Sequence, residues 1–348
     1  MELLWFCIVA FMITMYAILD GFDLGAGIIH LIAARSDEER RTILNAVGPV
    51  WDGNEVWLLA AGGTLYLAFP LLYASSFSGF YLPLMIVLWL LILRALGIEF
   101  RHQVHHPLWA TFWDGVFSLG SILLSIFFGA ALGNVVRGVP LQADGYFFSP
   151  LWTSFTPQDG TGILDWFTVL MGLVSFFTLT THGANFIAVK TEGMLRQRAR
   201  IFARWAWWGL TLTSTAALIA ATSIRPGLWD NFAAYPWGTI FPLGGIVGVV
   251  GMYIFNKRND DTKAFVSSAV FIAGMLATTA FGLFPIVLPS STNPAYSLTV
   301  STTLTHAYGL SVGIIWLTVG IALAVGYLVF LARTFKGKVK LPVEGEGY

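Results

Sequence analysis

The sequence predicts an all-α polytopic membrane protein with about nine transmembrane helices. Its residues are 56% hydrophobic and only 11% charged, and the mean hydropathy is +0.73. A soluble domain usually has about a quarter of its residues charged, so this chain could not cover itself with a water-compatible surface. Uncharged stretches run over 56–93 and 264–332, and both exceed the roughly 20 residues that one helix needs to cross the hydrocarbon core. Each of these two stretches must therefore fold back once.

The individual spans follow from these apolar stretches and from the residues that interrupt them. The second span is expected to end where Pro70 and the small polar residues of 75–79 break the helix, and the eighth where 288–294 contains two prolines. The first span lacks the basic start of a signal peptide, so we interpret it as a retained helix. The whole chain, 1–348, is thus predicted to be one integral membrane domain. Its spans are expected near 4–33, 55–72, 80–98, 113–136, 163–189, 202–224, 238–255, 264–287 and 307–332.

The distribution of basic residues favours an odd number of spans. Sixteen of the 19 Lys and Arg residues, Lys340 among them, follow odd-numbered spans, and only Arg137 and Arg225 follow even-numbered ones. Because cytoplasmic loops carry the excess of Lys and Arg, the N-terminus is predicted outside and the C-terminus in the cytoplasm. A weak echo between Leu19–Asp23 and Thr181–Asn185 favours two four-helix bundles plus one peripheral helix, although chance would explain it equally well.

Ionisable residues inside the apolar stretches need an explanation, because inserting each one costs about 2.5–3.5 kcal/mol. Asp20 and Asp23 lie late in the first span, and their spacing of three places them on one helix face. Gly21 and Gly25 beside them form a Gly-x-x-x-Gly pair, which lets another helix approach closely. We favour a role for the two carboxylates in relaying protons from the cytoplasm. The alternative is that one of them pairs with an Arg such as Arg94 and fixes a helix contact.

The second predicted span opens with the polar segment Trp51–Trp57. Asp52 followed three residues later by Glu55 is typical of a capping box, and the tryptophan pair is typical of an interfacial aromatic belt. The spacing alone favours the cap. A capping carboxylate at the mouth of a dry interior can also take up protons, so the two interpretations are compatible.

Arg94 lies deep in the third span. An Arg at such a place pairs with a buried acid or with an acidic cofactor group such as a haem propionate. Snorkelling to the nearby cytoplasmic interface is an equally good interpretation.

Residues that could bind a metal or a haem are scarce. His182 in the fifth span is a weak candidate for a metal ligand, and a hydrogen-bonded packing role is favoured for it. The single cysteine, Cys7, excludes an internal disulfide, and no basic tract indicates nucleic acid binding. The chain by itself does not look like a catalyst that carries its own cofactor.

Six blocks of the sequence carry a family resemblance. They are YAILDGFDLGAG (16–27), NAVGPVWDGNEVW (45–57), AFP (68–70), FSGFY (77–81), RALGIEFR (94–101) and FPIVLPSST (284–292). In order and spacing these blocks resemble subunit II of the cytochrome bd-type quinol oxidases, a family that includes a cyanide-insensitive branch. They cover the first third of the chain densely and return near its C-terminus.

The resemblance implies a haem-free companion of a larger catalytic partner. That partner, subunit I, would hold haems b558, b595 and d, and would oxidise quinol. The complex would reduce dioxygen to water in a bacterial or archaeal cytoplasmic membrane, surrounded by lipids and accompanied by a small single-helix accessory subunit. Some relatives hold a structural quinone in subunit II, at a place that this sequence does not indicate.

Carried over to this chain, the resemblance also implies residue roles. It makes Asp52 the leading residue for proton uptake from the cytoplasm, on a pathway shared with Asp20, Asp23 and Glu55. Arg94 and Trp51 become candidates for contact with the haem region or for a buried ion pair on the subunit I side.

Two other functions stay open. An ion-coupled secondary transporter would also contain intramembrane acids, interrupted helices and an internal repeat. Against it, the acids concentrate in the first half of this chain, towards the predicted cytoplasmic end. A purely structural anchor for subunit I would use the same acids only for helix packing.

Overall fold

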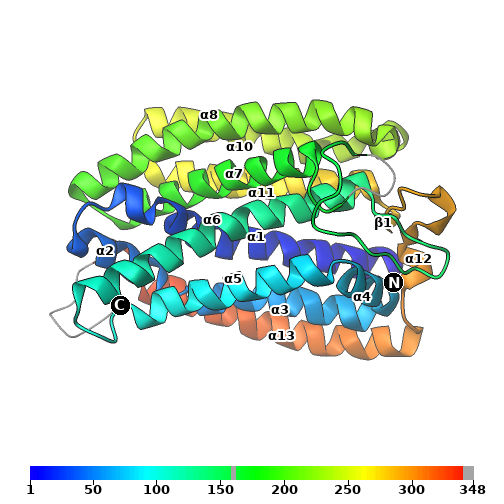
Figure 1. Ribbon diagram of the computed structural model, residues 1–348, viewed down its shortest axis with the longest axis horizontal. Helices are drawn as coiled ribbons and strands as arrows, with labels where there is room; N and C mark the ends of the chain where they lie inside the picture. The colour runs from blue at the N-terminus through cyan, green and yellow to red at the C-terminus, as the bar shows by residue number, and fades with distance from the viewer. Residues whose placement is uncertain (158–161, 340–348) are drawn as a thin grey trace.

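Long α-helices run side by side along the long axis of the molecule in the computed structural model, which describes residues 1–157 and 162–339 (Figure 1). Lys340, counted above among the basic residues, lies outside the described residues, as does the rest of the predicted domain beyond it. The long helices are α1 (Glu2–Ala33), α3 (Trp51–Ala68), α5 (Tyr81–Phe100), α6 (Pro107–Arg137), α7 (Trp166–Lys190), α8 (Gly193–Ile224), α10 (Ile240–Lys257), α11 (Asp261–Leu283) and α13 (Ala307–Thr334). Each one contains most of a predicted span.

Seven of these helices are long and apolar enough to cross a membrane within the described part of the chain. They are α1, α5, α6, α7, α10, α11 and α13. Helices α3 and α8 are not in that group, although both pack along the others. An all-α membrane protein is therefore confirmed, and the count of nine spans stays a prediction.

Short elements connect the long helices. The helical ones are α2 (Asp37–Val47), α4 (Pro70–Gly79), α9 (Asp230–Ala234), α12 (Val300–Thr303) and the 3-10 turns η1 (Pro226–Trp229), η2 (Pro236–Thr239) and η3 (Pro294–Tyr296). Strands β1 (Ile286–Leu288) and β2 (Leu298–Thr299) form one small antiparallel ladder, in which Ile286 faces Thr299.

Two helices end before the predicted ends of their spans, and proline explains both. The span 55–72 ends at Ala68, and Pro70 opens the separate helix α4, because proline has no backbone N–H to continue α3 but suits the first turn of a new helix. The span 264–287 ends at Leu283. Phe284 is extended before Pro285, since the ring of a proline disfavours helical backbone in the residue before it.

Three helical segments extend into stretches that the apolar pattern treats as loops. The helix α6 begins at Pro107 and α8 at Gly193, ahead of the expected starts at 113 and 202. Hydropathy marks only the part of a helix that suits hydrocarbon, and a charged first turn can stay helical in water. The helix α2 is capped by Ser36, whose side chain accepts a hydrogen bond from the Glu39 backbone N–H, and it buries Ile43 and Leu44.

Helices α1 and α7 cross where two glycines meet. A Cβ atom added to Gly25 would lie 2.7 Å from the Gly183 Cα, and one added to Gly183 would lie 2.4 Å from the Gly25 Cα. Only glycine allows the backbones to come this close. This crossing joins the group α1, α3, α5 and α6 to the group α7, α8, α10 and α11, while α13 packs against α3 at one side (Figure 1).

The connections between long helices gather at two opposite ends of the molecule. At one end, Arg198 of α8 forms an ion pair with Glu39 of α2, and Lys338 donates hydrogen bonds to backbone carbonyls beside the end of α7. At the other end, the Val139 N–H donates to the Pro289 carbonyl, and the Thr305 N–H donates to the Ala68 carbonyl. The basic connections that the sequence assigns to the cytoplasm thus share one end.

Candidate functional site: a buried charge network

A buried guanidinium links three helices near the basic end of the molecule. Arg94 on α5 is fully buried, and it donates one hydrogen bond to Asp20 of α1 at 2.6 Å and another to Glu55 of α3 at 2.8 Å. Asp20 is fully buried too, whereas the Glu55 side chain is 21% exposed. Hydrogen-bonded ion pairs of this geometry are among the stronger polar contacts in a low-dielectric interior.

The second acid of α1 has a different partner. Asp23 is fully buried and accepts a hydrogen bond from the Asn54 side-chain amide at 2.8 Å. One carboxylate oxygen of Asp20 and one of Asp23 have no hydrogen-bond partner among the described residues. These two oxygens are free to bind a proton or a water molecule.

Asp52 lies at the exposed start of the same region, but the predicted capping box is wrong. The residue before the first turn of α3 is Val50, and no side chain caps this helix. Pro49 and Val50 continue the turn after α2, which shifts the helix start so that Asp52 stands in the first turn and not before it. Its carboxylate still faces the positive end of the helix dipole. Trp51 donates a hydrogen bond of 3.3 Å to Glu99 of α5.

His182 sits in a hydrogen-bonded packing site between α7, α1 and α11. Its Nε2 lies 2.9 Å from the Ile18 carbonyl oxygen, its Nδ1 lies 2.7 Å from the Ser268 hydroxyl, and its ring stacks on Phe265. A carbonyl only accepts, so Nε2 carries the proton. Both ring nitrogens are thus engaged, and the described residues contain no group of three or more His, Cys, Asp or Glu that could hold a metal ion.

A second buried network was not predicted from the sequence. Asp114 of α6 accepts hydrogen bonds from Arg101 at 2.6 Å and lies 2.7 Å from His30 of α1, with Arg40 of α2 at 3.4 Å. Arg101 also donates to Asp37 of α2. The sequence offered one indication of this network, because Asp114 is the only acid in the stretch 107–137.

The charge of Arg101 is secured by this network. Burial opposes the charge, but the hydrogen bonds that the guanidinium donates to Asp114 and Asp37 outweigh burial and raise the pKa of Arg101 above its ordinary value. Arg101 therefore stays positive at any physiological pH and keeps α2 attached to the α5–α6 turn.

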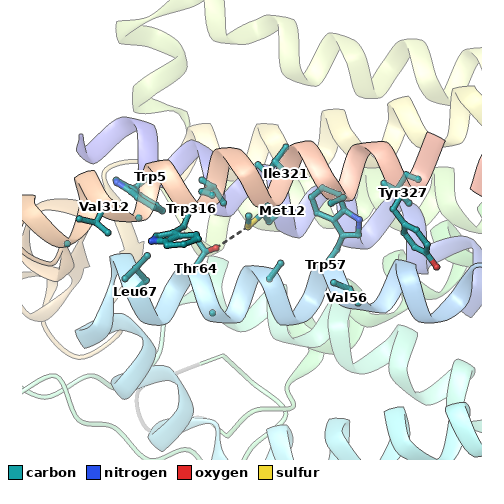
Figure 2. Close-up of a pocket in the computed structure, with 18 of the residues that line it drawn as sticks. Trp5, Met12, Val56, Trp57, Thr64, Leu67, Val312, Trp316, Ile321 and Tyr327 are labelled. Atoms are coloured by element: carbon teal, nitrogen blue, oxygen red, sulfur yellow. Dashed lines mark hydrogen bonds between the residues drawn. The ribbon is translucent and has the colours of Figure 1, made fainter. Parts of the chain in front are cut away.

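An apolar groove of about 700 Å³ runs between α3 and α13, with α1 at its floor. Figure 2 shows Trp5, Trp57 and Trp316 along it, together with Thr64, whose hydroxyl contacts the Met12 sulfur at 3.3 Å. The Nε1 of Trp5 is buried and has no hydrogen-bond partner among the described residues. The groove is thus lined mainly by apolar and aromatic side chains.

The fold and site together define a multi-pass membrane protein built around buried carboxylates and guanidinium groups. The family model described as "Cytochrome bd terminal oxidase subunit II" matches residues 1–335. A "Probable cytochrome oxidase subunit 2" from Haemophilus influenzae is 33% identical, with 97% of this chain and 95% of the relative covered. The "Cytochrome bd ubiquinol oxidase subunit 2" of Bacillus subtilis is 32% identical over 89% of this chain and 88% of the relative.

A solved structure agrees in fold. One chain of the bd oxidase from Geobacillus thermodenitrificans matches with a TM-score of 0.76 at 18% identity, covering 96% of this chain and 98% of that chain. The chain belongs to the cytochrome bd terminal oxidase subunit II family, and the resemblance noted in the sequence is confirmed. It is therefore a subunit of an oxidoreductase complex of the respiratory chain, with a subunit I as its implied partner. The comparisons give no support to the transporter alternative.

Proposed function

We propose that this chain is the haem-free subunit II of a quinol:oxygen oxidoreductase and that it supplies a proton pathway from the cytoplasm. One observation carries the proposal: polar side chains follow one another from the exposed Asp52 into the interior, and those from Glu55 inward are hydrogen-bonded to each other. Asp52 and Glu55 share one face of α3, Glu55 pairs with Arg94, and Arg94 pairs with the fully buried Asp20.

The charges of the network favour proton exchange. Asp20, Asp23 and Glu55 are three acids around a single cation, Arg94. Like charges this close in a low-dielectric interior cannot all stay ionised, so the network holds at least one exchangeable proton. Protons handed on from Asp20 or Asp23 would reach acids of subunit I. A purely structural anchor would need no more buried carboxylates than its cations can neutralise.

The orientation of the chain follows the same proposal. The end that carries Asp52 also carries the basic connections, so we place it in the cytoplasm, with the N-terminus outside. The grouping of α1, α3, α5 and α6 against α7, α8, α10 and α11, with α13 outside both, supports two four-helix bundles plus a peripheral helix.

The engagement of this chain's own donor side chains supports a placement of the haems in the partner subunit. The hydrogen bonds that occupy both ring nitrogens of His182 support our placing haems b558, b595 and d in subunit I. Those haems supply the reduction of dioxygen. Arg94 is engaged with two acids of its own chain, which favours the ion-pair role over a contact with a haem propionate.

The groove between α3 and α13 fits the quinone expected from the resemblance. Its apolar wall suits an isoprenoid tail. In this proposal the quinone serves structure, because it stabilises the loosely packed helix α13 against α3.

The proton pathway is tested with Asp52→Asn in the whole complex. We expect oxygen consumption with quinol to fall by about a hundredfold, the lower end of the range for a lost proton-transfer group, while the visible haem spectrum is unchanged. Glu38→Gln is the matched control, because Glu38 is an exposed acid at the same end of the molecule. Normal oxygen consumption by Asp52→Asn would leave the structural anchor as the better proposal.

A further inference from the structure

The membrane face of α8 and α10 contains a second, smaller recess whose chemistry differs from that of the apolar groove. It measures about 200 Å³ and lies at the basic end of α10. Its lining combines cations, amphipathic aromatic rings and one amide: Arg204, Trp207, Trp208, Tyr253, Asn256 and Lys257. None of these residues belongs to the buried networks described above.

No acid among the described residues neutralises the two cations of this recess. Arg204 and Lys257 form no ion pair with any described residue. Other basic residues of the same helix are paired, since Arg196 and Arg200 both contact Asp261 at 2.7 Å. Two unpaired cations at one recess create a strongly positive site, which attracts an anion.

A buried donor adds to this positive site. The Nδ2 atom of Asn256 is shielded from solvent and has no hydrogen-bond partner among the described residues. An unsatisfied buried N–H group is costly, so a ligand that accepts from it after a small rotation of the Asn256 side chain gains affinity. Trp207 is fixed in place by a hydrogen bond from its Nε1 to the Val249 carbonyl, and it packs against Tyr253. The recess is therefore rigid on one wall.

The surroundings indicate where the anion comes from. Lys257 is the last residue of a membrane-crossing segment, and Trp208 and Tyr253 are exposed, as expected of aromatic rings at the depth of lipid headgroups. Exposed apolar side chains continue from the recess towards the membrane interior on both helices, including Leu212 and Val250. A phospholipid whose phosphate lies in the recess would thus have its acyl chains packed along these two helices.

We propose that the recess between α8 and α10 binds the phosphate of an anionic phospholipid from the cytoplasmic leaflet. Arg204 and Lys257 pair with the phosphate, and Asn256 donates a hydrogen bond to one of its oxygens. The aromatic rings contact the glycerol region. The bound lipid satisfies the charges at the end of α10 and attaches that helix to α8.

The test uses the purified whole complex, delipidated in detergent and titrated with dioleoyl phosphatidylglycerol, with binding read by native mass spectrometry. The double variant Arg204→Gln/Lys257→Gln should weaken binding of this lipid by about fivefold for each charge removed. Asn256→Asp, which keeps the side-chain shape but repels phosphate, should weaken it as well. Arg258→Gln is the matched control, because Arg258 is an exposed cation next to Lys257 that does not line the recess.

Three outcomes would overturn the proposal. Unchanged binding in both the double variant and Asn256→Asp would show that the recess is not the lipid site. Equal binding of dioleoyl phosphatidylcholine would show that negative charge is not what is recognised. Displacement of phosphatidylglycerol by excess inorganic phosphate would identify free phosphate as the ligand. The haem spectrum of each variant checks that the complex is intact.

Discussion

Arg94 explains how three acids are tolerated inside the helical bundle. Each ionisable group costs about 2.5–3.5 kcal/mol to insert alone, and an ion pair with two hydrogen-bonded carboxylates offsets much of this cost. Removing one partner of such a network leaves the other charges uncompensated. This destabilises a protein more than replacing the whole pair by apolar residues. The stability of the chain therefore depends on Arg94 as much as on any apolar residue.

Replacement of Arg94 by Gln should destabilise the subunit by about 3–5 kcal/mol, because Asp20 and Glu55 would then be buried without a cation. Arg94→Lys should rescue this only in part, since one ammonium cannot bridge two carboxylates as a guanidinium fork does. The measurement is the midpoint of thermal denaturation of the purified complex. Equal midpoints for Arg94→Gln and the wild type would mean that the ion pair contributes nothing.

Asp114 provides a second test at a single position, with an internal comparison. Asp114→Asn removes the buried charge that Arg101 faces, and should cost about 3–5 kcal/mol. Asp37→Asn removes the other acid on Arg101, but Asp37 is 67% exposed and its loss should cost about 0–1 kcal/mol. Thermal denaturation of both variants checks the difference. A larger loss of stability in Asp37→Asn than in Asp114→Asn would mean that Arg101 stabilises the protein mainly through its exposed ion pair.

Helices α1 and α7 depend on the absence of side chains where they cross. A Cβ atom at Gly25 would lie 1.9 Å from the Leu179 carbonyl oxygen, a distance that only a backbone shift could relieve. The Gly-x-x-x-Gly pair seen in the sequence therefore marks a real contact at Gly25. Its partner on α7 was not predicted, because the weak echo around Gly183 gave no indication that the two segments touch.

Gly25→Ala should consequently separate α1 from α7 and destabilise the chain by about 1–3 kcal/mol or more, the range for overpacking. Gly115→Ala is the matched control, since nothing lies within 4 Å of a Cβ atom added there. That variant should be neutral or gain up to about 1 kcal/mol from the better helix propensity of alanine. Yield of assembled complex from membranes and its thermal midpoint measure both. Similar losses in the two variants would contradict the close crossing.

At the scale of the whole molecule, the two ends differ in charge and face different compartments in the proposed orientation. Gln103 lies in the α5–α6 turn at the basic end, and Asp144 lies in the segment between α6 and α7 at the other end. Both residues are exposed. Because Cys7 is the single cysteine of the chain, a Cys7→Ser background allows each end to be labelled separately.

In intact cells, a membrane-impermeant thiol reagent should label the Asp144→Cys variant and leave the Gln103→Cys variant unlabelled until the membrane is opened. The physical reason is the excess of Lys and Arg that cytoplasmic loops carry. Labelling of Gln103→Cys from outside would reverse the orientation and would remove Asp52 from the cytoplasmic side. Labelling of both from outside would contradict the single span, 113–136, that separates the two positions.

The sequence by itself determined the class of protein, the approximate position of each long helix and the family. Hydrophobicity and basic charge are summed over consecutive residues, so these features can be predicted without knowledge of how the helices pack. It also identified Asp20, Asp23 and Arg94 as unusual, because an ionisable residue in an apolar stretch can be recognised from the sequence alone.

Only the tertiary structure decided which of these groups meet. Arg94 pairs with residues 74 and 39 positions away, and Asp114 pairs with His30 at a separation of 84. Such pairings depend on how each helix is rotated and how closely two helices pack, and neither property is encoded in a local pattern. The true starts of α3, α6 and α8 were decided in the same way, because a helix end is set by its contacts and backbone hydrogen bonds and not by hydropathy.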